Sequence, residues 1–243
     1  MKRRWRQRVF ATVAMAVLAT GCGASNGSAP VPPNEPPRDC VPSGGATGSP
    51  GTIEEAVALI NSLPRPTSVA CLVESLDRPL RLSATESDFS AQPAHGRRSP
   101  RIFLFSGPLI LSVVPDGPGA EVVEFSQFDD SGRSIKGELA FPVEAEVSPE
   151  APYTKVMFQP ELTHCGLCHA DEQPAYRVGN AWAYSSRALR PVDSTLVPLE
   201  ELRREASTCD ASVEPERCRL LQELFEHGTP RAHSFPASFS TFP

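Results

Sequence analysis

The middle of the chain alternates between short apolar runs and clusters of turn-forming residues. Such runs cover residues 69–76, 102–105, 109–114, 121–128, 134–141 and 143–147. Several of them are separated by Gly and Pro or by Asp, Ser and Gly, as at residues 116–119 and 129–132. Short strands punctuated in this way are typical of an antiparallel β-sandwich or barrel. The pattern predicts a mainly β, sandwich-like domain over residues 51–156.

Helical spacing of apolar residues occurs in three places. Residues 52–55 have the form of a capping box, and apolar residues then recur at helical spacing as far as Ile60. Residues 196–206 carry an apolar stripe, and so does a segment that begins at Pro215 and ends at Gly228. The last two helices predict a small, mostly α-helical domain over residues 157–243, which makes the overall fold class α+β.

The first fifty residues differ in composition from the rest. Residues 1–8 are basic and residues 9–19 are apolar, but this run is too short to span a bilayer. The next residues, Ala19-Thr20-Gly21-Cys22, resemble the lipobox of bacterial lipoproteins. That resemblance implies a signal peptide over residues 1–21, a lipid anchor on Cys22, and a place in the cell envelope, at the outer membrane facing the periplasm or the cell surface. Residues 22–50 are rich in Gly, Ser and Pro and are predicted to be a disordered tether.

Composition and charge narrow the function classes. Five basic residues precede Cys22, and the remaining 18 Lys and Arg stand against 29 Asp and Glu, a net charge of −11. An acidic surface argues against nucleic acid as a partner. The β region contains no nucleophile elbow, glycine-rich phosphate loop or carboxylate pair at catalytic spacing. The sequence leaves enzymatic activity uncertain and favours an electron carrier or a binding protein.

The clearest candidate chemistry is Cys165-Gly166-Leu167-Cys168-His169, a Cys-x-x-Cys-His pattern. Two thiols at this spacing can each add to one vinyl group of a porphyrin, and the histidine can then bind the iron. The pattern resembles the haem-attachment motif of c-type cytochromes. The resemblance implies a covalent haem c on Cys165 and Cys168, His169 as the proximal iron ligand, and a cytochrome c-like fold for the C-terminal domain.

Two other uses of these cysteines stay open. They can form a small disulfide, or they can supply half of a zinc site together with His164 or His169. The sixth iron ligand is also open, because no methionine follows Met157 and the downstream histidines are His227 and His233. The sequence allows His233, His227 or no protein ligand at that position. Trp182 and Tyr184 are expected to be core aromatics or one wall of a flat apolar ligand.

Cysteine spacing suggests three pairs once Cys22 carries lipid: Cys40 with Cys71, Cys165 with Cys168, and Cys209 with Cys218. Six cysteines allow fifteen connectivities, so these pairings are hypotheses. An oxidising compartment accounts for so many cysteines. The sequence therefore predicts a lipid-anchored envelope protein that transfers single electrons through a haem c to a redox partner protein. The alternative is a lipoprotein without haem that acts as a binding or scaffold module, with Cys165–Cys168 as a disulfide.

Overall fold

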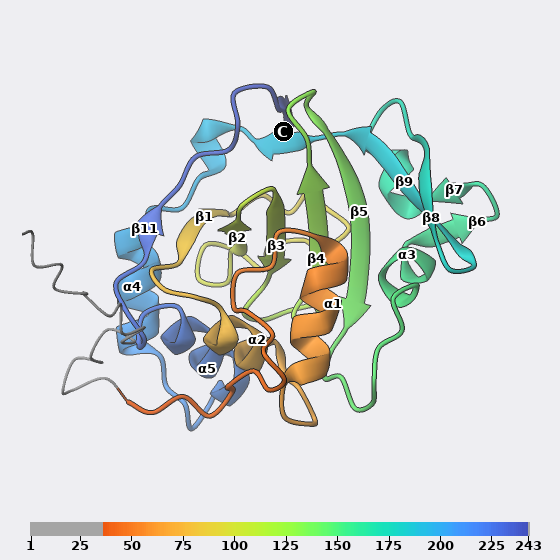
Figure 1. Cartoon of the computed structure of the whole chain (residues 1–243). Coiled ribbons are helices and arrows are strands. Elements are labelled where there is room, and N and C mark those ends of the chain that lie inside the picture. The colour runs from red at the N-terminus through yellow and green to blue at the C-terminus, as the bar shows by residue number, and fades with distance from the viewer. Residues whose placement is uncertain (1–35, 243) are drawn as a thin grey trace, which may run out of the picture. The chain divides into compact units, whose positions relative to one another are not determined.

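The computed structural model describes residues 36–242, and most of their strands belong to one mixed sheet (Figure 1). The strand order is β11-β1-β2-β3-β4-β5-β9-β8. The strands are β1 (Arg81–Thr85), β2 (Arg101–Ser106), β3 (Leu109–Val113), β4 (Val122–Phe128), β5 (Arg133–Ala140), β8 (Gln173–Val178), β9 (Ala181–Arg187) and β11 (Arg231–Ala232). Adjacent strands are antiparallel, except that β1 and β11 pair in parallel. The predicted signal peptide and the lipobox at Cys22 lie outside the described residues.

Short helices and two small strand pairs complete the described part of the chain. The helices are α1 (Ile53–Ser62), α2 (Val69–Ser75), α3 (Ala151–Lys155), α4 (Leu199–Thr208), α5 (Pro215–Glu223) and the 3-10 turns η1 (His164–Leu167) and η2 (Asp193–Thr195). The pairs are β6 (Met157–Gln159) with β7 (Leu162–Thr163), and β10 (Leu189–Pro191) with β12 (Ser240–Phe242). None of these helices has the length and apolarity that crossing a bilayer requires.

Helix α1 begins where the capping box predicts. The Thr52 hydroxyl accepts a hydrogen bond from the Glu55 amide at 3.1 Å, and the Glu55 carboxylate accepts one from the Gly51 amide at 2.6 Å. The first contact satisfies an amide that the first helical turn leaves without a partner, and the second ties the residue before the cap to the helix. The amide of Ile53 donates to the Gln127 side chain on β4 at 3.0 Å. The cap therefore both starts the helix and fixes it against the sheet.

Two of the predicted strands are wrong. Residues 69–75 form helix α2, whose first turn is capped by the Ser68 hydroxyl accepting from the Cys71 amide at 3.1 Å. All seven residues of this helix are buried, so its sequence shows no amphipathic period and resembles a buried strand. Residues 143–147 form no strand, and Val143 makes only an isolated bridge with Thr67.

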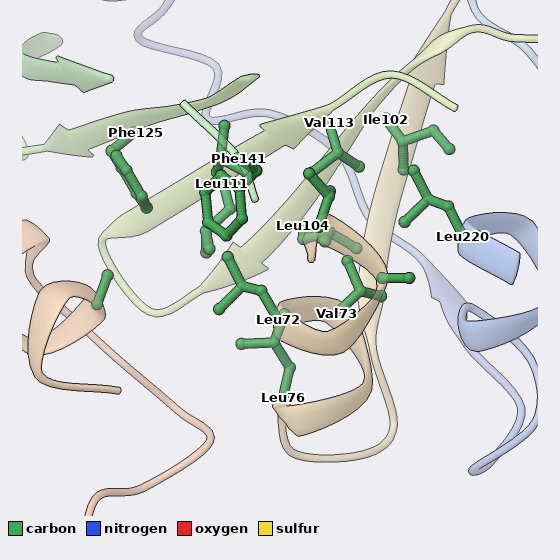
Figure 2. Packing of buried hydrophobic residues seen from close by; sticks show 14 of the residues in the cluster. Leu72, Val73, Leu76, Ile102, Leu104, Leu111, Val113, Phe125, Phe141 and Leu220 are labelled. Atoms are coloured by element: carbon green, nitrogen blue, oxygen red, sulfur yellow. The ribbon is translucent and has the colours of Figure 1, made fainter. Parts of the chain in front are cut away.

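The main core lies between one face of the sheet and helices α1, α2 and α5. Figure 2 shows side chains of α2 and α5 pointing toward alternate residues of the strands. The labelled members of this cluster are Leu72, Val73, Leu76, Ile102, Leu104, Leu111, Val113, Phe125, Phe141 and Leu220. Each of them is at least nine-tenths buried, and full burial of one such side chain contributes about 1.5–3 kcal/mol. Because successive strand residues point to opposite faces, Arg101, Phe103 and Ser112 lie on the other face of the sheet.

The predicted fold class is wrong. The chain does not end in a small, mostly helical cytochrome c-like domain, because β8, β9 and β11 join the same sheet as β1–β5. Residues 133–135 of β5 pair with residues 185–187 of β9. The helices of the C-terminal region, α4 and α5, are only 10 and 9 residues long. Strand β8 is mostly exposed and contains Pro174, so it lacks the alternation that identifies a strand in sequence.

Two disulfides join segments of this unit. Cys40–Cys71 connects the N-terminal segment to α2, and Cys209–Cys218 connects α4 to α5. Both pairings are those expected from the cysteine spacing. The third expected pair is not bonded, since Cys165 and Cys168 are both free thiols in the structure.

Candidate functional site

The Cys165–His169 motif lies on a single helical turn that follows the β6–β7 hairpin. The Thr163 hydroxyl accepts a hydrogen bond from the Gly166 amide at 3.2 Å and so caps the turn. The amides of Cys168 and His169 both donate to the Cys165 carbonyl, at 3.1 and 2.9 Å. The backbone therefore holds the two thiols and the imidazole of the motif together on one short, hydrogen-bonded segment.

Gly166 lies against the Glu172 carboxylate. A Cβ atom at position 166 would lie 2.6 Å from Oε1 of Glu172, so the carboxylate would have to shift. That carboxylate accepts hydrogen bonds from the amide and the hydroxyl of Thr163, the first of them at 3.0 Å. The close approach of Glu172 thus anchors the residue that caps the turn.

The thiols of the motif are accessible. Cys165 is half-buried and Cys168 is exposed, whereas the four other cysteines in the described part of the chain are paired in disulfides. Free thiols in a chain that otherwise pairs its cysteines are available for addition to another group.

His169 is held in a neutral form that leaves one nitrogen available. Its Nδ1 lies 2.8 Å from the Arg187 carbonyl oxygen. Because a carbonyl only accepts, Nδ1 carries the proton and the lone pair remains on Nε2. Burial, and secondly the positive charge of Lys136, lower the pKa of His169 to about 3. A neutral imidazole whose N–H is fixed by a carbonyl is the usual form of a metal-binding histidine.

Both cysteines, His164 and His169 line a cleft on the face of the sheet opposite α2. The enclosed space of the cleft is about 120 Å³. Its walls also come from the segments 85–91, 189–191 and 235–239. Cofactor sites in proteins occupy roughly 300–1,000 Å³, so the segments around this smaller space would have to move apart to admit a porphyrin.

One part of the cleft is aromatic. Phe103 and Phe235 pack edge to face with ring centres 4.9 Å apart, and Phe239 lies 6.3 Å from Phe235. Phe103, Ile110 and Phe239 belong to a second buried cluster, separate from the main core. This cluster provides an apolar wall for a flat, largely apolar ligand.

The strands supply charged and polar side chains to the rest of the cleft. Arg101 on β2 pairs with Glu124 on β4 at 2.5 Å and donates to the Ser112 hydroxyl at 2.6 Å. Lys136 on β5 donates to the Ser126 hydroxyl at 2.8 Å, and burial lowers the pKa of Lys136 to about 8. Side chains alternate between the two faces along each strand, and these charged residues all occupy positions on the cleft side of the sheet.

His164 adds a further cation beside the motif. Hydrogen bonding to the Cys165 sulfur, and secondly to Glu138, raises the pKa of His164 to about 10. Its Nε2 lies 3.3 Å from the Glu138 carboxylate. The imidazole is therefore protonated at neutral pH and connects the motif to strand β5.

The histidines considered as sixth ligands are not among the residues that line this cleft. His227 is buried next to Glu223 and Glu74. His233 packs its ring against Phe105, with ring centres 4.6 Å apart, and its amide donates to the Leu82 carbonyl. The structure thus places both histidines outside the wall that contains His169.

The two aromatics after the motif also lie outside the lining. Tyr184 is a buried residue of β9, as expected of a core aromatic. Trp182 is 37% exposed, and the Arg177 guanidinium stacks 4.6 Å from its ring centre.

The cleft residues that sequence reasoning missed are Arg101, Glu124 and Lys136. Each is a charged residue within a strand of the sheet, two positions from another residue that lines the cleft. That alternation is the signal that could have identified them, since a polar group inside a buried strand points to a lined cavity.

The residue types along this cleft are those that a covalent haem requires. Two free thiols at the attachment spacing, a neutral imidazole with its N–H fixed, and an aromatic wall face the same space. Comparison of the chain with protein-family models, with curated proteins and with solved structures finds no match.

Proposed function

We propose that this protein is a lipid-anchored envelope protein that carries one covalent haem c and transfers single electrons to a redox partner protein. Cys165 and Cys168 would form the thioether bonds, and His169 would be the proximal iron ligand. Cys22 would carry the lipid that holds the protein at the membrane. The attachment turn belongs to a protein built on a mixed sheet, so the proposal does not depend on a cytochrome c fold.

The observation that carries this proposal is the arrangement of the motif within the cleft. The capped turn brings both free thiols and the neutral imidazole to one wall of the same space. A small disulfide or a surface loop requires no cleft beside it. A porphyrin does, because its apolar ring must be shielded from water.

The contacts around the cleft indicate what each residue would do for a bound haem. The Arg187 carbonyl orients the His169 imidazole and keeps the proton on Nδ1. Phe103, Phe235 and Phe239 exclude water from the apolar part of the cleft. Arg101 and Lys136 line the cleft and would offer positive charge to the acidic groups of a cofactor. A haem iron bound here would exchange one electron, and these surroundings would set its potential.

Intact mass measurement tests the proposal. The chain is expressed with its own leader in a host that matures c-type haems, and the purified protein is analysed by mass spectrometry and by haem staining on a denaturing gel. We expect the mass of one haem and a Soret band, both abolished by Cys165→Ser with Cys168→Ser. The matched control is Leu167→Ala, because Leu167 lies between the cysteines and is 65% exposed.

A protein that lacks the haem mass in this host contradicts the proposal. Loss of two hydrogens between Cys165 and Cys168 would instead support a binding or scaffold module. The same spectrum tests Cys22, because lipidation adds the mass of acyl chains to a chain that begins at that cysteine.

A further inference from the structure

Three potential metal ligands from two separate elements meet inside the protein, on the α2–α5 side of the sheet. Glu74 comes from α2, Glu223 is the last residue of α5, and His227 follows one turn later. Their exposed fractions are 3%, 7% and 3%. His227 Nε2 lies 3.6 Å from Oε2 of Glu223 and 3.9 Å from Oε1 of Glu74. One ligand atom of each residue lies within 4.8 Å of the others.

The hydrogen bonds of the two carboxylates are unequal. Oε1 of Glu74 accepts from the Asp39 amide at 2.5 Å and from the Cys40 amide at 3.3 Å. Oε2 of Glu223 has no hydrogen-bond partner among the described residues, although it is buried and faces His227. A buried carboxylate oxygen without a donor costs free energy, so it indicates that something else satisfies it.

One arginine lies beside this cluster: Arg78 donates to the backbone carbonyls of Val73, Leu76 and Glu223. Glu74 and Glu223 nevertheless bring two carboxylates into one buried space, an arrangement that a bound cation stabilises.

The distances and donor types favour a first-row divalent metal ion. Zinc binds carboxylate oxygen and imidazole nitrogen at about 2.0–2.2 Å, so two ligand atoms of a tetrahedral site lie about 3.4 Å apart. The separations of 3.6 and 3.9 Å are close to that value. The Asp39 and Cys40 amides would orient the Glu74 carboxylate by donating hydrogen bonds to it, as is common in metal sites.

We propose that Glu74, Glu223 and His227 form a buried binding site for a divalent transition-metal ion such as Zn²⁺, with water at the fourth position. The ion connects α2 to the end of α5. Through Glu74 it also fixes the segment at Asp39 and Cys40, next to the Cys40–Cys71 disulfide. This site is structural, and it is independent of the haem proposal.

Metal binding to the chelator-treated full chain tests this inference. Zn²⁺ is titrated by calorimetry, and Co²⁺ is used as a visible-absorption probe of tetrahedral coordination. Every measurement is repeated with Cys165→Ser and Cys168→Ser, because free thiols also bind zinc. We expect one equivalent to bind in both backgrounds, with a rise in Tm.

Substitution of a residue that only hydrogen-bonds to a metal ligand typically weakens metal binding by about 10–100-fold. Glu223→Gln and His227→Gln change a ligand itself, so they are expected to weaken zinc binding by at least that factor. The matched control is Glu226→Gln, because Glu226 is exposed and lies on the same turn. Glu223→Gln has nearly the same shape as the wild type and removes a buried charge, so it should fold. Absence of saturable binding in the serine background, or equal affinity for Glu223→Gln and Glu226→Gln, overturns the proposal.

Discussion

The Glu223 carboxylate makes the stability of the metal-free protein depend on pH. Burial, and secondly the charge of Glu74, raise the pKa of Glu223 from 4.5 to about 7. At 1.36 kcal/mol per pKa unit, this shift corresponds to on the order of 3 kcal/mol. The folded state holds the proton more tightly than the unfolded state does. The stabilisation is therefore complete below about pH 4.5 and is lost as the pH rises through about 7.

Glu223→Gln removes this titration, because an amide stays neutral throughout the range. Urea unfolding of the chelator-treated protein at about pH 5 and about pH 8 measures the effect. We expect the difference between the two pH values to shrink by on the order of 3 kcal/mol in the variant relative to the wild type. The variant should also be more stable than the wild type at the higher pH.

Two controls separate the carboxylate from other causes. Glu226→Gln, at an exposed position, should keep most of the pH dependence of the wild type, because burial and Glu74 raise the pKa of Glu223 more than Glu226 does. Saturating Zn²⁺ should stabilise the wild type most at about pH 8, where metal no longer competes with the proton. Identical pH dependence in the wild type and in Glu223→Gln would refute the reasoning about this cluster.

Three further changes test the core, the disulfides and the attachment turn. Leu111→Ala, at a fully buried position, should lower the free energy of unfolding by about 2–5 kcal/mol, as measured by urea denaturation. Removing Cys40–Cys71 should destabilise the protein by about 1 kcal/mol more than removing Cys209–Cys218, because the first disulfide closes a loop of 31 residues and the second a loop of 9. Thermal unfolding of the two paired Cys→Ala variants checks this order. Gly166→Ala would displace the Glu172 carboxylate and weaken its hydrogen bond from the Thr163 amide, and so should lower the yield of covalent haem on a stained gel, whereas Leu167→Ala should not.

Sequence patterns predict the centre of the sheet well and its edges poorly. Strands β2–β5 alternate in polarity or are strongly apolar, and tight turns separate them, so local residues are enough to specify them. Helix α2 is buried on all sides and shows no period, so only its Ser68 cap distinguishes it from a strand. Strand β8 is an exposed edge whose pairing with β9 decides its structure. Tertiary contacts, rather than local propensity, determine these two elements.

The wrong fold class has a specific cause. A haem-attachment motif occupies five residues, and one capped turn is all the structure that it requires. The motif therefore predicts a local chemistry and carries no information about the domain around it. Likewise, the motif identifies Cys165, Cys168 and His169 as candidates, but Arg101 and Lys136 reach the cleft only because the strand register aligns alternate positions of β2 and β5. Register follows from the whole sheet, which a local pattern does not contain.

The cleft and the Glu74 cluster lie on opposite faces of one sheet, and this arrangement makes the two proposals separable. Helix α2 packs on the face formed by Leu104 and Leu111, whereas Arg101 and Ser112 face the cleft. A close-packed core transmits changes in shape, and Glu223→Gln leaves the shape of the side chain nearly unchanged. A substitution such as Glu223→Gln should therefore leave covalent haem attachment unchanged. Conversely, loss of both motif thiols should leave one equivalent of zinc bound, since no ligand atom is shared between the two sites.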